Sequence, residues 1–456
     1  MKAFNIGDVI IATDGVGKNI TDASMLIESV TMDSRQVKKG SLFVAIKGER
    51  VDGHDFINDC FSKGATAVLC DHIPEGVTGP CIEVENTVKG LQDLAKWYRE
   101  SLNVKVVGIT GSVGKTSTKE MVSAVLSEGF KTQKTIGNYN NEIGLPLTVL
   151  SIEEDTQVEV LEMGISDFGE MRVLSRIAQP NVCVITNIGE CHLEFLHDRD
   201  GVLKAKSEIF EFMSEDAKIY LNGDDDKLRT VKDVKGIKPV FYGFNKGNDV
   251  TLTDSESLGL KGSKLKMHYK GEDLKATIHM LGKHMQANAL VSFAIAKDMG
   301  LTDAQIKEGL AKAKTIDGRC NLIDYKGIGT IIDDCYNASP TSMKAALDTL
   351  VLAEGRKVAI MGDMFELGEN SDSMHAEVGT YAANVGIDKL ICVGENCKHM
   401  YEAAKKENKN LEISYFKSLE DLLSVLKTEV RDTDNIWVKS SHGMGFAKLV
   451  EALKER

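Results

Sequence analysis

A chain of 456 residues is long enough for about three domains, each able to bury its own core. Apolar residues make up 42% of the chain, yet no apolar run reaches the length of a membrane-spanning helix, so we expect no membrane insertion. A net charge of −13 would repel nucleic acid, so we expect an anionic ligand to be small and to be held by local basic groups and backbone amides.

The first residues and the cysteines indicate the compartment. The stretch "MKAFNIGDVIIATDG" places acidic residues around a short apolar patch and lacks the basic start and long apolar core of a signal peptide. Nine cysteines occur without a Cys-x-x-Cys pair, which predicts reduced thiols and neither a disulfide framework nor a zinc ribbon. We expect a cytoplasmic protein, and a monomer.

The first block, residues 1–100, mixes strand and helix patterns. Short apolar runs predict strands in "SLFVAIKG" and "ATAVLCD", with a helix over residues 54–63 between them. The block closes on "GLQDLAKWYRES", in which Leu91, Leu94 and Tyr98 fall on one helical face. These patterns predict a small mixed α/β domain.

The second block, residues 101–315, alternates buried strands with helices. Strands are predicted in "VKVVGIT", "VEVLEMG", "NVCVITNIG" and "KIYLNGD", and this alternation is typical of a mostly parallel sheet. The segments "SKLKMHYKG" and "DLKATIHMLG" alternate polar and apolar residues around a Gly-Glu-Asp turn, which predicts a β-hairpin appended to the sheet. A helix is expected from His284 to Met299.

The third block, residues 316–456, alternates again. Strands are predicted in "GTIIDD", "KVAIMGD", "KLICVG", "EISYF" and "NIWVKS", with amphipathic helices such as "SLEDLLSVLKTEV" between them. The block resembles an open Rossmann-like sheet, although no Gly-x-Gly-x-x-Gly follows any of its strands. The chain is therefore predicted to be a three-domain α/β protein.

The segment "VVGITGSVGKTSTKE" carries a strand, a glycine turn and a helix start in the order of a phosphate-binding loop. Gly111 and Gly114 permit a turn whose amides point inward, and the helix that begins near Lys115 adds its positive N-terminal dipole. We expect Lys115 to reach the β and γ phosphates of ATP, and the Thr116 hydroxyl to bind magnesium. The strict P-loop would need glycine at Ile109, so the spacing is a variant.

Other groups must decide among a kinase, a GTPase switch, a motor and a ligase. The nearest match to the guanine-binding Asn-Lys-x-Asp is "NKGN" at residues 245–248, which lacks the aspartate and argues against a GTPase. A magnesium site needs a carboxylate at the end of a neighbouring strand, where "VEVLEMG" places Glu162. Glu162 is therefore the predicted second ligand, and an ordinary surface glutamate is the alternative.

Ten segments in one order along nearly the whole chain resemble the Mur ligase family. They are "GITGSVGKTSTKE", "NYNNEIGLPLTVL", "LEMGISDFGEM", "TNIGECHLEFL", "AKSEIF", "LNGDD", "GKHMQANALVSFAIA", "DGRCNLI", "DDCYNASPTSMKAAL" and "MGDMFELGENSDSMHAEVG". Within the family, "NNEIGLPLTVL" and "YNASPTSMKAAL" resemble the branch that adds D-alanyl-D-alanine to a UDP-linked muramyl tripeptide of peptidoglycan. The Asp-Asn-Pro motif of the branch that adds the third residue is not found.

The resemblance implies an enzyme that uses ATP to activate a peptide carboxylate as an acyl phosphate, which the amine of D-Ala-D-Ala then attacks. Thr116 and Glu162 would hold one magnesium ion, and His192 would help to hold a second. Lys206, in "AKSEIF", matches the family lysine that CO2 carbamylates to give a metal ligand, although by itself it would be a solvated helix lysine. Arg319 would reach the terminal phosphate as an arginine finger in cis. The catalytic set is Lys115, His192, Lys206 and Arg319.

Further residues are implied to bind the nucleotide or the muramyl substrate. The nucleotide set is Thr110, Gly111, Ser112, Gly114, Lys115, Thr116, Ser117, Asn288, Arg319, Asp334, Tyr336 and Asn337. The segment "TMDSRQVKKGSLFVAIKGERVDGHDF" resembles the family's UDP-binding region, and "NYNNE" suits the muramyl peptide. The substrate set is Ser34, Arg35, His54, Asn138, Asn140 and Asn141. Strand ends and amide-rich turns are the structural alternatives for these segments.

One segment departs from the family pattern. The family usually has Lys-Gly-Ser-Arg followed by an acidic residue near the C-terminus, whereas this chain has "VKSSHGMGFAKLV" with His442 at the arginine position. Histidine cannot supply the permanent bidentate fork of arginine. D-Ala-D-lactate and D-Ala-D-Ser therefore stay open as acceptors, as do lysine and diaminopimelate at residue three of the tripeptide. Another Mur-type or folylpolyglutamate-type ligase and a nucleotide switch are the alternative functions.

Overall fold

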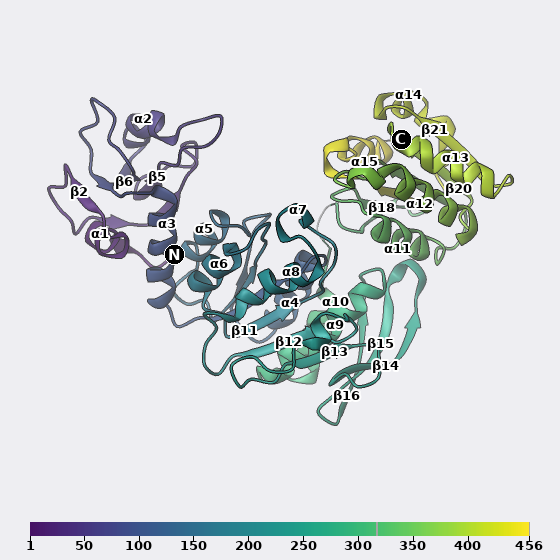
Figure 1. The fold of residues 1–456 in the computed structure, drawn as a ribbon, viewed down its shortest axis with the longest axis horizontal. Coiled ribbons are helices and arrows are strands. Elements are labelled where there is room, and N and C mark those ends of the chain that lie inside the picture. Colours follow the sequence, from purple (N-terminus) through teal and green to yellow (C-terminus); the bar gives the residue numbers. More distant parts are fainter. Residues whose placement is uncertain (316–317, 456) are drawn as a thin grey trace. The chain divides into compact units, whose positions relative to one another are not determined.

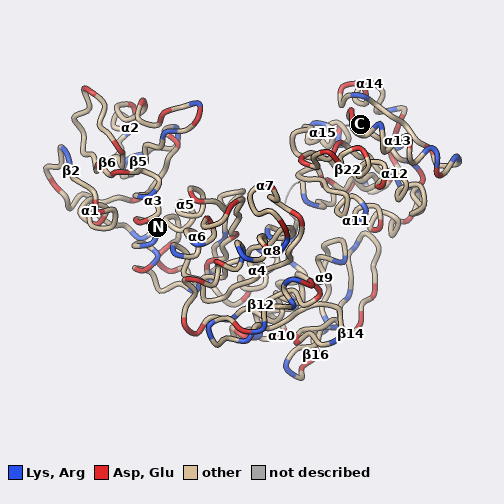
Figure 2. The backbone as a smooth tube through the Cα atoms, in the orientation of Figure 1, with Lys and Arg blue, Asp and Glu red and all other residues tan. Residues whose placement is uncertain are grey.

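The computed structural model describes residues 1–315 and 318–455 (Figure 1). The chain divides into two compact units: the first contains residues 1–252, 268–272 and 290–309, and the second contains the other described residues. Acidic and basic residues are interspersed along both units (Figure 2). No helix among the described residues is long and apolar enough to cross a membrane. The domain boundaries near residues 100 and 315 stay predictions.

A five-stranded sheet forms the N-terminal part of the first unit. Its order is β2-β7-β6-β5-β4, with β2 antiparallel to β7 and the other strands parallel. The strands are β2 Val16–Lys18, β4 Ser29–Thr31, β5 Ser41–Val44, β6 Ala65–Cys70 and β7 Cys81–Glu83, and a separate pair consists of β1 Phe4–Asn5 and β3 Leu26–Ile27. The helices are α1 Ile6–Thr13, α2 Ile57–Ser62 and α3 Thr87–Glu100. The predicted mixed α/β character is confirmed.

Helix α3 joins this part to the central sheet. Its predicted apolar face is buried, including Leu91, Leu94 and Tyr98. The Tyr98 hydroxyl donates to the carbonyl of Ile152 at 2.6 Å, and α3 packs against α5 (Gly144–Leu150) and α6 (Glu170–Ala178) (Figure 1). Side chains from both parts therefore share one apolar core, while a smaller separate cluster lies in the N-terminal part.

The central sheet has nine strands in the order β16-β15-β14-β13-β12-β11-β8-β10-β9, and the pairs from β14 to β9 are parallel. Its strands are β8 Lys105–Thr110, β9 Thr132–Lys134, β10 Val158–Glu162, β11 Val182–Ile185, β12 Lys218–Asn222, β13 Val240–Gly243, β14 Val250–Ser257, β15 Ser263–Tyr269 and β16 Glu272–Ile278. The remaining α-helices of this region are α4 Lys115–Leu126, α7 Leu193–Leu196, α8 Arg199–Ser207, α9 Lys283–Asp298 and α10 Asp303–Lys312. The predicted parallel sheet with an appended hairpin is confirmed, and β9, β13 and β14 were not predicted.

The register of the parallel strands places several polar residues at one edge of this sheet. Glu162 pairs with Ile109 across β10 and β8, and Ile185 pairs with Thr110 across β11 and β8. The loops that follow these three strands therefore leave the sheet together. In open parallel sheets this carboxyl edge is where ligands bind.

A six-stranded sheet forms the core of the second unit. Its order is β17-β18-β22-β19-β20-β21, with β17 antiparallel to β18 and the other pairs parallel. The strands are β17 Asn321–Tyr325, β18 Gly329–Asp334, β19 Lys357–Gly362, β20 Lys389–Val393, β21 Glu412–Phe416 and β22 Asn435–Lys439. The helices are α11 Pro340–Leu350, α12 Ser371–Val385, α13 Cys397–Glu407, α14 Leu419–Glu429 and α15 Ala447–Lys454. Met361 and Ile360 face separate apolar clusters, so both faces are covered, as a Rossmann-like sheet requires.

Candidate active site

The phosphate loop connects β8 to α4, and α4 begins at Lys115 as predicted. Its backbone has φ of +149° at Gly111 and +83° at Gly114. A Cβ atom on Gly111 would lie 2.0 Å from Thr186 Oγ1, so the close approach of these two loops requires glycine. Gly114 caps α4 without a side-chain hydrogen bond, which leaves the first-turn amides, including that of Ser117, for an anion.

A second loop, which follows β11, holds the phosphate loop in place. Thr186 Oγ1 donates to the carbonyl of Val113 at 2.6 Å. The N–H of Val113 donates to Asn187 Oδ1 at 2.9 Å, and the N–H of Gly189 donates to Ser112 Oγ at 2.8 Å. These and further hydrogen bonds between the loops, such as that from the N–H of Ser112 to the carbonyl of Asn187 at 3.1 Å, define the shape of the anion site.

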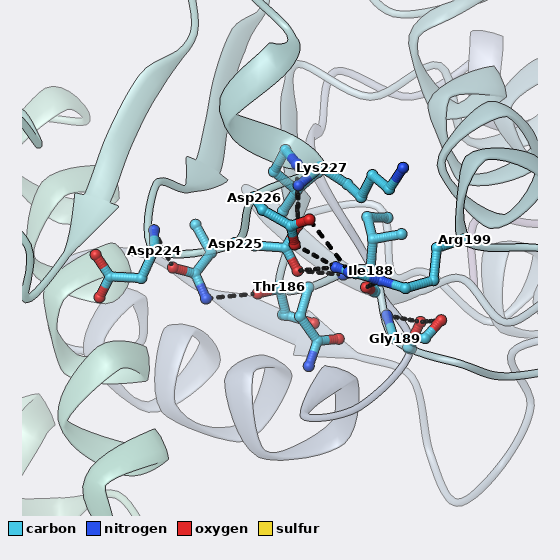
Figure 3. A network of polar contacts seen from close by, with 12 residues as sticks. Thr186, Ile188, Gly189, Arg199, Asp224, Asp225, Asp226 and Lys227 are labelled. Atoms are coloured by element: carbon cyan, nitrogen blue, oxygen red, sulfur yellow. Dashed lines mark hydrogen bonds and ion pairs between the residues drawn. The ribbon is translucent and has the colours of Figure 1, made fainter.

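An aspartate and an arginine fix this second loop from its other side (Figure 3). Asp225, after β12, accepts hydrogen bonds from the N–H groups of Ile188 at 2.8 Å and Lys227 at 3.0 Å. Arg199, at the start of α8, donates to the carbonyl of Ile188 at 2.9 Å and pairs with Asp226. Sequence reasoning included "TNIG" and "LNGDD" in the resemblance but gave these loop residues no role. The sequence signal that could have identified these residues was their position directly after successive parallel strands.

Glu162 and Thr116 lie together as predicted. Thr116 Oγ1 donates to Glu162 Oε1 at 3.2 Å, and Asn140 Nδ2 donates to the same oxygen at 2.9 Å. Glu162 is only 3% exposed, so it is no ordinary surface glutamate. Its Oε2 is buried without a hydrogen-bond partner among the described residues, and Lys119 Nζ is 4.0 Å away. A free carboxylate oxygen beside a threonine hydroxyl fits the hard oxygen ligands that Mg²⁺ prefers.

The two predicted catalytic lysines differ in environment. Lys115 Nζ donates to the carbonyls of Gly111 at 2.8 Å and Ser112 at 3.4 Å, so it folds back over the phosphate loop. Lys206, in α8, is only 1% exposed. Burial, and secondly the positive charge of Lys115, lower the pKa of Lys206 to about 8. With that pKa, roughly a tenth of the Lys206 amine is neutral at pH 7, which is the form that can react with CO2.

A cavity of about 560 Å³ opens beside the phosphate loop within the first unit. Its walls come from α3, the phosphate loop, the "NYNNE" loop, the segment after β10, α6 and the residue before α7: Val88, Lys115, Asn140, Asn141, Glu142, Ile143, Gly164, Ile165, Ser166, Glu170 and His192. Burial, together with the charge of Glu170, raises the pKa of the Glu142 carboxyl group. Four residues predicted from sequence, two catalytic and two substrate-binding, therefore line one space.

The three asparagines of "NYNNE" also shape their own loop. Asn141 Oδ1 accepts from the N–H of Gly144 at 2.9 Å at the start of α5. The carbonyl of Asn138 accepts from the N–H of Asn140 at 2.7 Å, and Asn140 bonds Glu162 as described. The amide-rich turn expected as the alternative is therefore present, and it does not conflict with substrate binding because Asn140 and Asn141 line the cavity.

The predicted uridine diphosphate residues lie in the N-terminal part. Arg35 Nε and Nη2 donate to Asp33 at 2.9 and 2.8 Å, while the arginine side chain stays 86% exposed. The carbonyl of Ser34 accepts from Lys63 Nζ at 3.0 Å. His54 is buried against two aspartates. Direct contact of these three residues with the substrate stays a prediction.

The predicted nucleotide residues of the second unit have structural partners there. Asp334 accepts from Lys439 Nζ at 2.7 Å and from Trp437 Nε1 at 3.3 Å, and Lys439 also donates to the carbonyl of Asn337 at 2.9 Å. Sequence reasoning missed Lys439. Its contact with Asp334 is explained by the parallel pairing of these two residues across β18 and β22.

An arginine and two rings form a further group in the second unit. The guanidinium carbon of Arg319 lies 4.2 Å from the centroid of the Tyr336 ring, and His442 lies 5.4 Å from the same ring. Arg319 Nε is buried without a hydrogen-bond partner among the described residues, so a donor is left for another acceptor. Asn288, in α9, is buried with its amide 3.6 Å from Met285 Sδ.

Fold and site together define a nucleotide-binding α/β protein with a glycine turn before α4, a buried glutamate beside a threonine hydroxyl, and a weakly basic buried lysine. Family models then match three segments: the Mur ligase family catalytic domain at residues 26–99, the Mur ligase middle domain at residues 109–296, and the Mur ligase glutamate ligase domain at residues 318–442. The chain belongs to the Mur ligase family.

Full-length relatives narrow the comparison. The chain is 38% identical over 436 residues to the UDP-N-acetylmuramoyl-tripeptide--D-alanyl-D-alanine ligase of Bacillus subtilis, with 94% of each chain covered. It is 32% identical to the enzyme of the same name from Escherichia coli, with 97% of each chain covered. A crystal structure of MurF from Acinetobacter baumannii matches 100% of both chains at 30% identity and a TM-score of 0.89. MurF ligase from Thermotoga maritima in complex with ADP matches 94% of this chain and 97% of its own at 30% identity and a TM-score of 0.82.

Proposed function

We propose that this chain is an ATP-dependent ligase that joins D-alanyl-D-alanine to UDP-N-acetylmuramoyl-tripeptide in peptidoglycan precursor synthesis. The names of its full-length relatives support the reaction, and the ADP complex of the Thermotoga maritima relative supports the nucleotide. The observation that carries the proposal is the cavity in which Lys115 and His192 meet Asn140 and Asn141, because it sets a phosphate-binding lysine beside room for a peptide end. We also infer a cytoplasmic, monomeric enzyme.

The reaction begins with two anions that repel each other, the tripeptide carboxylate and ATP. Lys115 moves from the carbonyls of Gly111 and Ser112 to the β and γ phosphates and screens this repulsion. A carboxylate oxygen attacks the γ phosphorus, the bond from that phosphorus to the β–γ bridging oxygen breaks, and ADP leaves. The amine of D-Ala-D-Ala then attacks the acyl carbon, phosphate leaves, and the nitrogen gives up a proton as the amide forms.

The metal ligands follow from the Glu162 oxygen that has no hydrogen-bond partner among the described residues. Thr116 and Glu162 hold one Mg²⁺, whereas His192 and a carbamylated Lys206 help to hold a second. Bound Mg²⁺ supplies positive charge that stabilises the phosphates in the transition state. The carbamate forms when the neutral Lys206 amine adds to the carbon of CO2 and loses a proton, which replaces a buried cation by an anion.

The remaining contacts are inferred by residue. Arg319 meets the terminal phosphate, and its buried Nε, which has no hydrogen-bond partner among the described residues, supports such a role. The nucleoside is held by Asn288, Asp334, Tyr336 and Asn337. The uridine diphosphate is held by Ser34 and Arg35, because the exposed Arg35 guanidinium can exchange Asp33 for a phosphate.

The proposal is tested by phosphate release from ATP with each substrate alone and with both. We expect release only when UDP-N-acetylmuramoyl-tripeptide and D-Ala-D-Ala are both present. Lys115→Ala should lower product formation by about 10²- to 10³-fold, the typical cost of a lost transition-state donor. Lys105→Ala is the control, because Lys105 lies at the exposed start of β8, the strand before the phosphate loop. This variant should stay fully active. Release with folate and glutamate, or nucleotide binding without turnover, would contradict the proposal.

A further inference from the structure

A cluster of histidine and aspartate side chains in the first unit has no part in the reaction proposed above. His54 lies in the 3-10 helix η1 (Gly53–Phe56), while Asp71 and His72 follow the end of β6. One possible ligand atom from each of these residues lies within 4.8 Å of the others. His54 is buried, but the side chains of Asp71 and His72 are 37% and 57% exposed, so an ion can enter from solvent.

Two hydrogen bonds fit a His54 ring with its proton on Nδ1 and a lone pair on Nε2. Asp52 Oδ1 lies 2.6 Å from His54 Nδ1, which places the ring proton on Nδ1. The main-chain N–H of Asp71 donates to Nε2 at 3.4 Å, which requires a lone pair on Nε2. A carboxylate that holds one ring nitrogen while the other nitrogen keeps its lone pair is the usual outer-shell arrangement of a metal-binding histidine.

Asp71 brings an anionic oxygen to that lone pair. Its Oδ1 lies 3.2 Å from His54 Nε2 and 2.6 Å from His72 Nδ1. A lone pair facing a carboxylate oxygen at this distance is repulsive unless a cation lies between them. The two imidazole rings stack with centroids 4.0 Å apart, so both are held beside the same carboxylate. The cluster thus offers two nitrogens and one oxygen to one cation.

A second histidine cluster, in the other unit, differs in how its histidine nitrogens are hydrogen-bonded. Asp363, His375 and Cys397 are all buried and equally close together. Nδ1 of His375 lies 2.7 Å from the carbonyl of Ser371, and Nε2 accepts from the N–H of Met364 at 3.0 Å, a closer contact than the 3.4 Å between the N–H of Asp71 and His54 Nε2. This second group is a satisfied hydrogen-bond network, and proximity alone does not distinguish it from a metal site.

We propose that His54 Nε2, Asp71 Oδ1 and His72 Nδ1 bind a divalent transition-metal ion of the zinc type, with Asp52 orienting His54. Two imidazoles and one carboxylate suit zinc and chemically similar ions better than Mg²⁺, which prefers oxygen alone. The ion connects η1 to the end of β6, and exposed His72 turns to complete the coordination. This role for His54 does not depend on the ligase reaction, and direct contact of His54 with uridine diphosphate stays a prediction.

The test is a calorimetric titration of the full-length, chelator-treated protein with Zn²⁺ at neutral pH. We expect one saturable site per chain and a higher melting temperature with Zn²⁺. His72→Ala should weaken binding by at least about tenfold and remove the thermal shift, as loss of a ligand or its support usually does. His399→Ala is the matched control, because His399 Nε2 also lies 3.4 Å from an exposed aspartate, Asp372, and should leave binding unchanged.

Two further measurements keep the proposal testable if a variant folds poorly. Visible absorption of Co²⁺ added to the native protein should show nitrogen and oxygen coordination that Zn²⁺ displaces. Asp71→Asn, which keeps the shape of the side chain, should also weaken Zn²⁺ binding. Equal Zn²⁺ affinity of the wild type and His72→Ala would overturn the proposal. So would NMR evidence of protons on both His54 nitrogens at saturating Zn²⁺, because a proton would then be the bridging cation.

Discussion

Single residues in this protein gain unusual chemistry from burial. Lys206 would be a solvated helix lysine by its sequence context, yet it is 1% exposed, whereas Lys204 on the same helix is exposed. Desolvation disfavours the ammonium form, so burial lowers the pKa of Lys206. The difference between two lysines two residues apart supports the proposal that only one of them reacts with CO2.

Carbamylation of Lys206 should follow the fraction of neutral amine. Because the pKa is lowered to about 8, that fraction is about a half at pH 8 and levels off only above about pH 9. NMR with ¹³C-labelled bicarbonate should show a carbamate signal with this pH dependence. The signal should be absent in Lys206→Ala and present in Lys204→Ala. Withdrawal of bicarbonate should lower activity, and an unmodified Lys206 in fully active enzyme would contradict the role.

At the scale of elements, strand β10 carries two buried carboxyl groups with opposite consequences. Glu162 accepts hydrogen bonds from Thr116 and Asn140, and we propose that it binds a magnesium ion. Glu159 is 1% exposed, and its Oε2 has no hydrogen-bond partner within the described part of the chain. Burial therefore raises the pKa of Glu159 well above 4.5. Glu159 therefore lowers the stability of the folded protein, whereas Glu162 on the same strand has a proposed function.

The substitution Glu159→Gln should stabilise the protein in a pH-dependent way. Since the folded-state pKa is raised, the unfolded chain loses its proton first, and stability falls as pH rises from about 4.5 towards the folded value. The variant should gain about 1–3 kcal/mol near pH 8 and less near pH 5, measured as urea midpoints. Glu75→Gln, at an exposed position, should change neither midpoint. An equal gain at both pH values would rule out titration as the cause.

The phosphate loop depends on its glycines because of backbone conformation and the close approach of a second loop. In Gly111→Ala, the new methyl group would collide with Thr186 Oγ1 while φ is held at +149°, which costs about 1–3 kcal/mol in strain alone. We expect a lower melting temperature and at least tenfold weaker ATP binding by calorimetry, about 1.4 kcal/mol. Gly76→Ala is the control, because φ is also positive there but nothing lies near the Cβ. ATP affinity like the wild type would show that the two loops separate easily.

The elements themselves were largely predictable, whereas their partners were not. The strand ending at Thr110 and the helix starting at Lys115 follow from an apolar run and the glycine turn. The bond from Asn140 to Glu162 joins residues 22 positions apart, and no local pattern encodes it. Strand β14 was missed because most of its residues are exposed or only partly buried, so it lacks an apolar signal.

At the scale of the whole molecule, the open question is the acceptor. The resemblance leads us to expect an arginine where His442 stands, and the His442 ring lies beside Tyr336 in the second unit. His442→Arg restores a permanent bidentate donor. If this position reads the acceptor carboxylate, the variant should lower KM for D-Ala-D-Ala by about tenfold, the value of one charge-assisted hydrogen bond. Steady-state kinetics should compare D-Ala-D-Ala, D-Ala-D-Ser and D-Ala-D-lactate. Unchanged selectivity in His442→Arg would place acceptor recognition elsewhere.

The amino-acid sequence by itself determined the three-block α/β order, the phosphate loop, and the residue types expected at its edge. These follow from local periodicity, from glycine's access to positive φ, and from the chemistry of lysine, threonine and glutamate. Only the tertiary structure decided that one Glu162 oxygen has no hydrogen-bond partner among the described residues, that Lys206 is a weak base, and that Asp71 faces His54. Unpaired atoms and shifted pKa values arise when residues far apart in the chain exclude water from one another, and that exclusion is a property of packing.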